Sequence, residues 1–241
     1  MTEGAAGTAR AHIDGLLGWW RLAGVDTPVA EDRADWLGLK THVPPAAKPS
    51  GQDAGADLPH DLNQFHQFLA ASPGLPESRW PGPRILPAGA PAPRLMIVVD
   101  APDADARESG QVFDADAARL LSRMTRAIGI DMSDCYVASL SLVTPPPGTM
   151  DPALTDQLAQ RMRHHIALVE PAAVMLVGGR ASRALLSTGP GPSAENLPFV
   201  NHHGGIVKAV PVVHPRLMLG QPSAKAEAWR SLRRLARNCG Q

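Results

Sequence analysis

The chain has 241 residues, a formal net charge of zero and only 4% aromatic residues. A neutral chain has no overall field that draws it to nucleic acid or membrane, so any phosphate binding must come from local groups. Its two cysteines, Cys135 and Cys239, lie far apart in sequence, which excludes a cysteine-ligated cluster or zinc site built by this chain alone. No run of about 18 apolar residues occurs, so we expect no membrane partner and a cytoplasmic location.

The first 58 residues differ in character from the rest of the chain. Apolar residues recur at helical spacing over residues 9–24, which predicts a docking helix. Residues 38–58 are rich in Pro, Gly, Ala and Ser, a composition typical of a linker. We therefore expect an N-terminal helical extension over 1–37, a Pro/Gly-rich linker over 38–58 and one folded domain over 59–241.

Beyond a short predicted helix over 59–72, apolar strand patterns alternate with helical patterns. The predicted strands cover 95–99, 135–143, 172–179 and 206–214. The helices that follow them cover 116–130, a segment that Asp151 caps and Pro152 opens, 180–186 and 224–238. Four apolar runs separated by helices predict an α/β fold, a three-layer α/β/α sandwich around a central, mainly parallel four-stranded sheet.

Polar side chains stand near the carboxyl ends of three predicted strands. Asp100 follows the first strand, Ser139 lies on the second and His214 ends the fourth. Ligands bind at this edge of parallel sheets, so the three could converge on one crevice. A purely structural role remains the alternative to a functional one for two residues. An Asp before Ala-Pro, as at Asp100, commonly forms a turn or cap, and Phe113 taken alone is expected in the core.

Glycines and histidines form two further patterns. Gly178 and Gly179 precede a helix and could receive an anion at its N-terminus, but the Lys-Ser/Thr of a P-loop is missing. The histidines of the NHHGG stretch, 201–205, and of the pair at 164 and 165 lack the spacing of a metal site. We therefore expect no metal, and expect 201–205 to form a polar surface loop or to allow a close backbone approach at Gly204 and Gly205.

Four stretches, taken in order, resemble the uracil-DNA glycosylase superfamily, and within it the iron-sulfur branch. They are VVDAPDADARESGQVF, YVASLSLVTPPP, VMLVGGRASRALL and VVHPRLMLGQPSAKAEAW. The resemblance runs from about Leu75 to Ala236 and leaves the first 60 residues outside. It implies the fold of that family and the removal of a base from DNA.

The resemblance also implies roles for individual residues. In that branch a motif GEAPG ends the first strand, and here it is matched by Val99, Asp100, Ala101, Pro102 and Asp103. The match implies that Asp100 positions the attacking water and that Ala101 and Pro102 contact the base. Phe113 matches the aromatic residue that stacks on the extruded base. His214, in a His-Pro pair, matches the imidazole that stabilises charge on the departing base.

Two features depart from the family. Ser139 stands where the family has an Asn that reads the edge of uracil, and a hydroxyl cannot reproduce the paired donor and acceptor of an amide. The four cluster cysteines align near residues that cannot ligate iron, namely Ala70, Pro73, Val143 and Leu158. We therefore expect no cofactor, and expect packing of the Pro-rich and N-terminal segments to replace the cluster.

Cations suited to DNA contact follow the His-Pro pair. Arg216, Lys225 and Arg230 match the position of the family loop that enters the minor groove, and a solvated helix face is the alternative explanation. Acidic residues gather in the first loop and would repel DNA if all of them faced it: Asp103, Asp105, Glu108, Asp114 and Asp116.

Three functions remain open from the sequence. The leading one is a monomeric glycosylase that hydrolyses the N-glycosidic bond of uracil or another deaminated base in DNA, as in base excision repair. That chemistry needs an anion near the sugar or water, a donor near the base oxygen and an aromatic face for the extruded base. The second is a catalytically degenerate nucleic-acid or nucleotide-binding module. The third is a small-nucleoside hydrolase or transferase that never meets duplex DNA.

Overall fold

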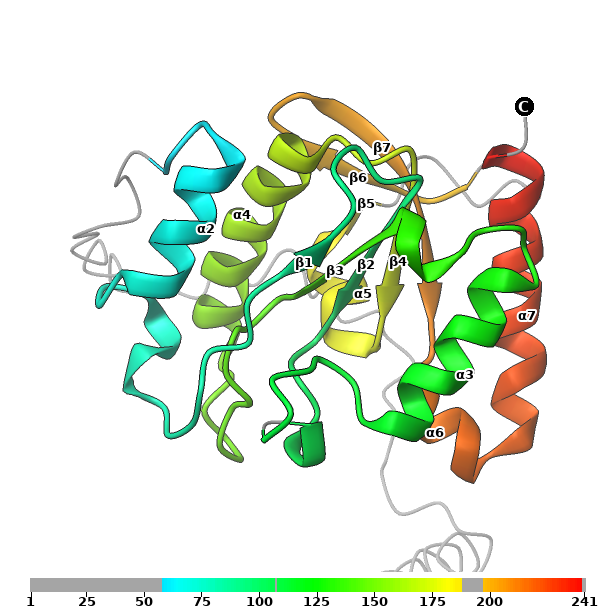
Figure 1. The fold of residues 1–241 in the computed structure, drawn as a ribbon, viewed down its shortest axis with the longest axis horizontal. Coiled ribbons are helices and arrows are strands. Elements are labelled where there is room, and N and C mark those ends of the chain that lie inside the picture. The colour runs from blue at the N-terminus through cyan, green and yellow to red at the C-terminus, as the bar shows by residue number, and fades with distance from the viewer. Residues whose placement is uncertain (1–57, 107, 188–196, 240–241) are drawn as a thin grey trace, which may run out of the picture. The chain divides into compact units, whose positions relative to one another are not determined.

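The protein is built around one seven-stranded sheet, whose four central strands run parallel (Figure 1). The computed structural model describes residues 58–106, 108–187 and 197–239. The strands are β1 (Ala88–Gly89), β2 (Leu95–Val99), β3 (Cys135–Ser139), β4 (Val174–Val177), β5 (Leu186–Ser187), β6 (Phe199–His202) and β7 (Gly205–Val212). Their order is β1-β3-β2-β4-β7-β6-β5, and β1, β6 and β5 pair antiparallel at the two edges.

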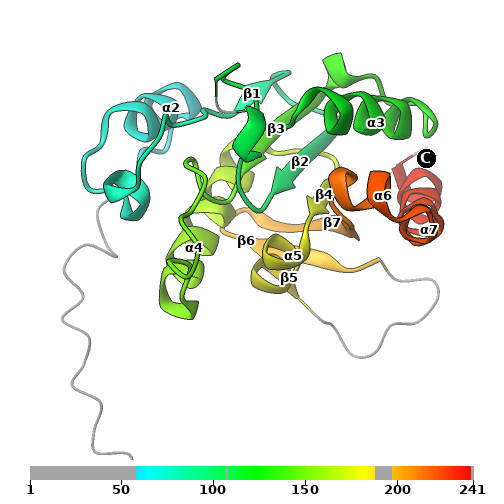
Figure 2. The same ribbon diagram turned by 90° about the horizontal axis from the view of Figure 1, so that it is seen from below.

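Helices cover both faces of the sheet. They are α2 (Leu62–Ala71), α3 (Ala115–Arg126), α4 (Pro152–Val169), α5 (Gly179–Leu185), α6 (Pro215–Gly220) and α7 (Pro222–Cys239), with short 3-10 turns at 76–79, 104–106 and 132–134. Figure 2 shows α3, α6 and α7 on one side of the sheet and α4 and α5 on the other. The buried strand β2 divides its side chains between two apolar clusters, with Leu95, Ile97 and Val99 on the α3 side and Met96 and Val98 on the α4 side. This arrangement confirms the predicted three-layer α/β/α sandwich.

Carboxylate caps set the starts of three helices. Asp151 Oδ1 accepts the backbone N–H of Leu154 at 2.7 Å, and Pro152 occupies the first turn of α4, as the sequence predicted. Asp61 caps α2 and Asp114 caps α3 in the same way. Each cap satisfies backbone donors that have no partner within the helix.

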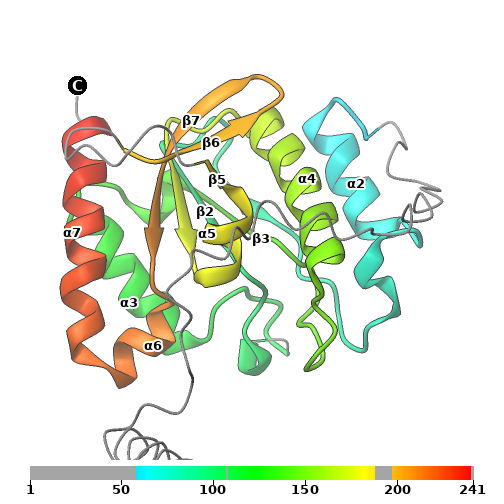
Figure 3. The same ribbon diagram turned by 180° about the vertical axis from the view of Figure 1, so that it is seen from behind.

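The segment before the sheet is held by apolar packing and by a buried ion pair. Phe65, Leu69 and Leu75 form an apolar cluster with Leu142, and Figure 3 shows α2 beside α4. Within this region the Arg161 guanidinium on α4 lies 2.5 Å from the Oε1 atom of Glu77, which is fully buried. The same guanidinium donates to the carbonyl of Leu140, which fixes the chain just beyond β3.

The structure alters several boundaries that the sequence predicted. Strand β3 ends at Ser139 rather than at 143, because residues 140–143 stay buried but leave the strand ladder. The edge strands β1, β5 and β6 and the short helix α6 were not predicted. The stretch 201–205, expected in a surface loop, contains the end of β6, a two-residue turn at 203–204 and the first residue of β7, and Asn201 pairs with Ile206. The predicted helix over 9–24 and the linker over 38–58 lie outside the described residues, except for Leu58. Across the described ranges, no helix is both long and apolar enough to span a bilayer.

Candidate active site

The candidate site residues lie at the edge where the parallel strands end. Val99 pairs with both Ser139 and Val177, and Val177 pairs with Val212, so these four strand ends are level. The chain passes from β2 to β3 on one side and then to β4 on the other, so the strand order reverses between β2 and β4. Ligand crevices in open α/β sheets form at such a reversal. The residue that follows β2 at this point is Asp100.

Asp100 caps helix α5. Its Oδ1 accepts the backbone N–H of Ala181 at 2.5 Å, and its Oδ2 accepts that of Arg180 at 3.2 Å. Gly178 makes this approach possible, because a Cβ at that position would lie 2.6 Å from the Asp100 carboxyl carbon and its φ is +106°. The anion expected before this helix is therefore supplied by the chain's own carboxylate. The half-buried carboxylate keeps lone pairs that are not used by the cap.

The two rings predicted to hold the base meet each other. The Phe113 and His214 ring centroids lie 5.6 Å apart at an angle of 40°. Phe113 is only 7% exposed and belongs to the apolar cluster beneath α3. It therefore lies in the core, as expected for a Phe taken alone, and also contacts His214. His214 is half-buried, and its Nδ1 accepts the backbone N–H of Arg216 at 3.3 Å as the cap of α6. The fold thus joins residues 101 positions apart.

The carboxylate that faces His214 belongs to Asp103 and not to Asp100. Asp103 Oδ1 lies 3.7 Å from His214 Nε2, whereas the Asp100 carboxylate is turned to α5. In the sequence Asp103 ends the stretch that matches GEAPG and is one of the acidic residues of the first loop, and neither position predicts a contact with His214. The sequence position of Asp103, three residues after Asp100, does not reveal its contact with His214, because that contact depends on the path of the loop after β2. The geometry therefore places Asp103, and not Asp100, opposite the His214 imidazole.

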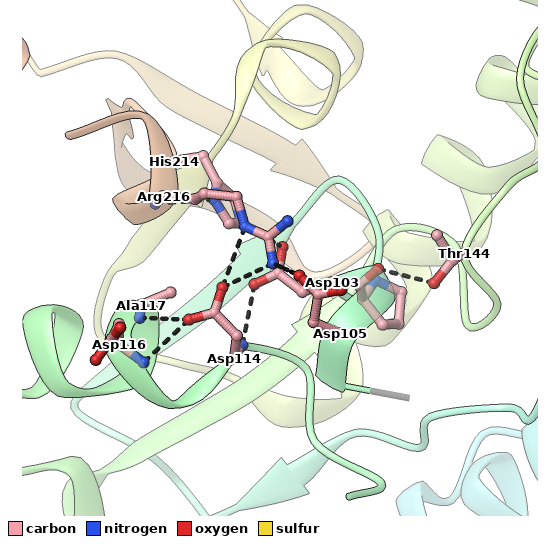
Figure 4. A network of polar contacts seen from close by, with 9 residues as sticks. Asp103, Asp105, Asp114, Asp116, Ala117, Thr144, His214 and Arg216 are labelled. Atoms are coloured by element: carbon pink, nitrogen blue, oxygen red, sulfur yellow. Dashed lines mark hydrogen bonds and ion pairs between the residues drawn. The ribbon is translucent and has the colours of Figure 1, made fainter. Parts of the chain in front are cut away.

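Arg216 forms ion pairs with three aspartates of the acidic loop after β2, namely Asp103, Asp105 and Asp114 (Figure 4). Its guanidinium donates to Asp114 Oδ2 from Nε at 3.1 Å and from Nη2 at 2.8 Å, and to Asp105 Oδ2 from Nη2 at 2.8 Å. Its Nε also lies 3.9 Å from Asp103 Oδ1. The backbone N–H of Ala117 and the Arg216 guanidinium hold the pKa of Asp114 below its usual value. The predicted role of Arg216 as a free DNA contact is therefore opposed by these ion pairs, which also offset the acidity of the loop.

Ser139 is buried, and its hydroxyl has no hydrogen-bond partner among the described residues. An unpaired buried polar group is uncommon in a folded protein. The Ser139 hydroxyl is therefore a candidate to form a hydrogen bond with a bound ligand. Nearby, the carbonyl of Pro102 accepts the hydroxyl of Thr144 at 2.9 Å, which fixes the turn after β2. Ala101 is half-buried and Pro102 is buried. Both lie in the predicted place directly after Asp100.

A hollow of about 420 Å³ opens beside His214. His214, Arg216, Leu217, Gly220 and Gln221 line it, so helix α6 and its cap form its wall. Of the three residues expected to converge on one crevice, Asp100, Ser139 and His214, this hollow is lined by His214 alone. His214 reaches the hollow and Phe113 contacts His214, whereas Asp100 and Ser139 lie at the adjoining strand ends and do not line this hollow.

The other two predicted DNA contacts lie on α7. Lys225 and Arg230 are exposed, and Arg230 Nε donates to the carbonyl of Ala226 at 3.4 Å within the helix. Lys225 also borders a hollow of about 200 Å³ between α3, α6 and α7, next to the partly exposed Trp229. Both cations are therefore accessible from solvent on the side of the fold that carries α6.

The residues at the cluster positions do not fit an iron-sulfur cluster. Ala70 and Pro73 are exposed, Val143 and Leu158 are buried, and none of these side chains can ligate iron. No group of three or more His, Cys, Asp or Glu suited to a metal occurs in the part of the chain that the structure describes. Burial raises the pKa of the Cys135 thiol to about 11, which disfavours the thiolate that a metal requires.

Known proteins are similar to the part of the chain that contains the candidate site. The family model described as the uracil DNA glycosylase superfamily matches residues 86–233. A curated relative, the type-4 uracil-DNA glycosylase of Archaeoglobus fulgidus, is 22% identical over 154 residues, which cover 61% of this chain and 77% of the relative. The family match extends from β1 into α7 and includes every predicted site residue.

Proposed function

Because the chain belongs to the uracil-DNA glycosylase superfamily, we propose that it hydrolyses the N-glycosidic bond of uracil or another deaminated base in DNA. One observation carries this proposal. His214 and Phe113 lie in ring contact at the carboxyl edge of the sheet, beside a hollow of about 420 Å³. A hydrogen-bond donor next to an aromatic face is what the departure of an extruded base requires.

His214 would stabilise the departing base. Its Nδ1 accepts a backbone N–H, so the neutral imidazole carries its proton on Nε2 and can donate it to a base carbonyl oxygen. As the glycosidic bond breaks, its electron pair stays on the base, and this hydrogen bond strengthens with the growing negative charge. Removing such a donor typically slows a reaction by about 10²- to 10³-fold.

Asp100 would hold the attacking water. Two of its lone-pair positions accept the N–H groups of α5, and the others can accept a water O–H beside the sugar. The water oxygen bonds to C1′, the glycosidic bond breaks, and the proton lost by water ends on the free base through solvent. The products are an abasic sugar and the neutral base.

Phe113 and Ser139 would select the base. Phe113 has its ring beside His214, and stacking on an aromatic ring is worth about 1–3 kcal/mol per base. The unpaired Ser139 hydroxyl can serve as a single donor or acceptor, which suits a wider range of bases than an amide does. We therefore include hypoxanthine and xanthine with uracil among the candidate substrates.

An oligonucleotide assay tests the proposal. Single- and double-stranded oligonucleotides that carry uracil, hypoxanthine or xanthine are incubated with the protein, and abasic sites are revealed by alkaline cleavage. We expect cleavage at one of these bases, and a loss of at least 100-fold in His214→Ala. His203→Ala is the matched control, because His203 is exposed in the turn that begins β7, at the end opposite His214. No cleavage of any substrate would contradict the proposal.

A second candidate is a module of the same fold that binds nucleic acid without cleaving it. The specific observation in its favour is that Asp100 is engaged as a helix cap and Arg216 as a partner of three aspartates. This candidate predicts salt-sensitive DNA binding, unchanged in His214→Ala, together with no cleavage. Free deoxyuridine and deoxyinosine, added as substrates in the same experiment, test the small-nucleoside alternative.

A further inference from the structure

Asp103 is fixed beside His214 by contacts of its own. Its Oδ2 accepts the backbone N–H of Asp114 at 3.1 Å, and its backbone N–H donates to the carbonyl of Val112 at 2.9 Å. Its side chain is only 10% exposed. The loop that leaves β2 is therefore closed on itself at this residue, and the remaining oxygen, Oδ1, is held toward His214 Nε2 at 3.7 Å (Figure 4).

The imidazole is held from both sides. The backbone N–H of Arg216 points to Nδ1 at 3.3 Å, which places the proton of the neutral ring on Nε2. The Asp103 carboxylate then faces that proton. At 3.7 Å the contact is electrostatic rather than a direct hydrogen bond, and such contacts commonly tighten only when substrate binds. A carboxylate opposite one ring nitrogen and an acceptor role for the other together select one tautomer and one ring orientation.

We propose that Asp103 is a positioning residue whose carboxylate faces the Nε2–H of His214 and holds the ring in one tautomer and one orientation until a base carbonyl takes the place of that carboxylate. The inference rests on the proposed function of this site. Asp103 occupies the last position of the stretch that matches GEAPG, where that motif has a glycine and hence no side chain. This chain therefore has a carboxylate beside its catalytic imidazole that the motif does not provide.

Arg216 completes the arrangement. A carboxylate left beside a departing anionic base would oppose its charge, but the Arg216 guanidinium lies 3.9 Å from the same Oδ1. Asp105 and Asp114 fix that guanidinium from the other side. The charged groups that face His214 are thus Asp103 from the loop after β2 and Arg216 from α6, with Asp114 at the start of α3 behind them. In this arrangement Arg216 supports Asp103 rather than a DNA phosphate.

The test compares Asp103→Ala and Asp103→Asn with Asp105→Ala. Asp105 is the matched control because its exposed carboxylate pairs with the same guanidinium but does not contact His214. The ¹⁵N chemical shifts of the His214 imidazole report which ring nitrogen carries the proton, and single-turnover base release reports the rate. We expect the Nε2–H tautomer to dominate in the wild type and Asp105→Ala. In Asp103→Ala and Asp103→Asn, which both lack the acceptor oxygen facing Nε2, we expect the Nδ1–H fraction to rise several-fold and the rate to fall about tenfold.

The outcomes separate this inference from the proposed function. An unchanged tautomer ratio in Asp103→Ala, or an equal change in Asp105→Ala, would overturn it whether or not a base is released. If the wild type releases no base, the glycosylase proposal fails, while the spectrum alone still decides whether Asp103 orients the ring. The single amide oxygen of Asp103→Asn can accept the Asp114 N–H and hold the loop while its NH2 group faces the imidazole, so an equal change in both Asp103 variants shows that the loss does not come from a loosened loop.

Discussion

Asp100 accepts a hydrogen bond of 2.5 Å from the backbone N–H of Ala181, which joins the end of β2 to the start of α5. The bond places a carboxylate at the point where the strand order reverses. It also gives one side chain two tasks, because the group that caps a helix is the group proposed to hold water. A substitution there changes stability and catalysis together.

Asp100→Ala is expected to lower the free energy of unfolding by about 1 kcal/mol, the usual effect of losing a helix cap. It is also expected to slow base release by about 100-fold or more, because a positioned carboxylate contributes on that scale. Urea denaturation and single-turnover kinetics measure the two effects. Asp151→Ala is the control, since it removes the cap of α4 away from the site and should cost similar stability without loss of rate. Equal rate losses in the two variants would refute a catalytic role.

Phe113→Leu separates stacking from packing. Phe113 is buried in the apolar cluster under α3, so Phe113→Ala would leave a cavity and cost about 3–5 kcal/mol. Leu keeps most of the volume, and we expect a loss of stability of about 1.5 kcal/mol or less. Because stacking is worth about 1–3 kcal/mol, affinity for an oligonucleotide with a target base should fall about 5- to 150-fold, with little change for undamaged DNA. Fluorescence anisotropy measures both, and an equal loss on the two DNAs would contradict stacking.

His165 makes stability depend on pH. Burial, together with the charges of His66, Arg161 and His164, lowers the pKa of His165 to about 3, and its Nε2 lies 2.8 Å from the Tyr136 hydroxyl. In the unfolded chain the imidazole titrates near 6.5, so between these values the unfolded state binds more protons. The free energy of unfolding should therefore be greatest above pH 6.5 and fall by up to about 1.4 kcal/mol per pH unit below it.

His165→Gln removes this titration but keeps a polar partner for Tyr136. We expect it to cost about 1–2 kcal/mol at pH 7 and to flatten the loss of stability between pH 6.5 and pH 4. Urea denaturation at several pH values measures both quantities. His203→Gln, at an exposed position, should retain the wild-type slope. A slope in His165→Gln as steep as that of the wild type would show that other groups control acid sensitivity.

The buried pair of Glu77 and Arg161 is expected to act as one unit. Removing one partner leaves an uncompensated buried charge, so Glu77→Ala should lower the free energy of unfolding by about 3–5 kcal/mol. The double variant Glu77→Met with Arg161→Met should be less destabilised than Glu77→Ala, because it leaves no isolated charge. Denaturant titration of the wild type and the two variants decides the matter. A double variant that is destabilised as much as Glu77→Ala, or more, would contradict this prediction.

The parallel core was predictable because burial on both faces makes its strands continuous apolar runs. Residues 95–99 are all buried and were predicted with their observed bounds. The run over 135–143 was too long, because residues 140–143 are buried without being paired, and apolar character alone cannot distinguish these cases. The edge strands β1, β5 and β6 lie outside the parallel core and have only two to four residues each. Such short segments are too short to show the two-residue alternation of a strand.

A site residue could be predicted from the sequence only where it directly follows the end of a strand. His214 and Asp100 follow their strands by one or two positions, and both lie at the expected edge. The partners of these residues depend on loops and on helix starts far away in sequence. Asp103 faces His214 because the loop after β2 folds back, and Asp100 caps α5 because Gly178 leaves room for it. Neither relationship leaves a periodic signal.

The most direct measurement is mass spectrometry of the free base formed in a single turnover with excess protein over an oligonucleotide that contains one uracil, hypoxanthine or xanthine. We expect one equivalent of free base from at least one of these substrates with the wild type and with His203→Ala, and at least 100-fold slower release with His214→Ala. Release of no base from any substrate, or equally fast release by His214→Ala, would contradict it.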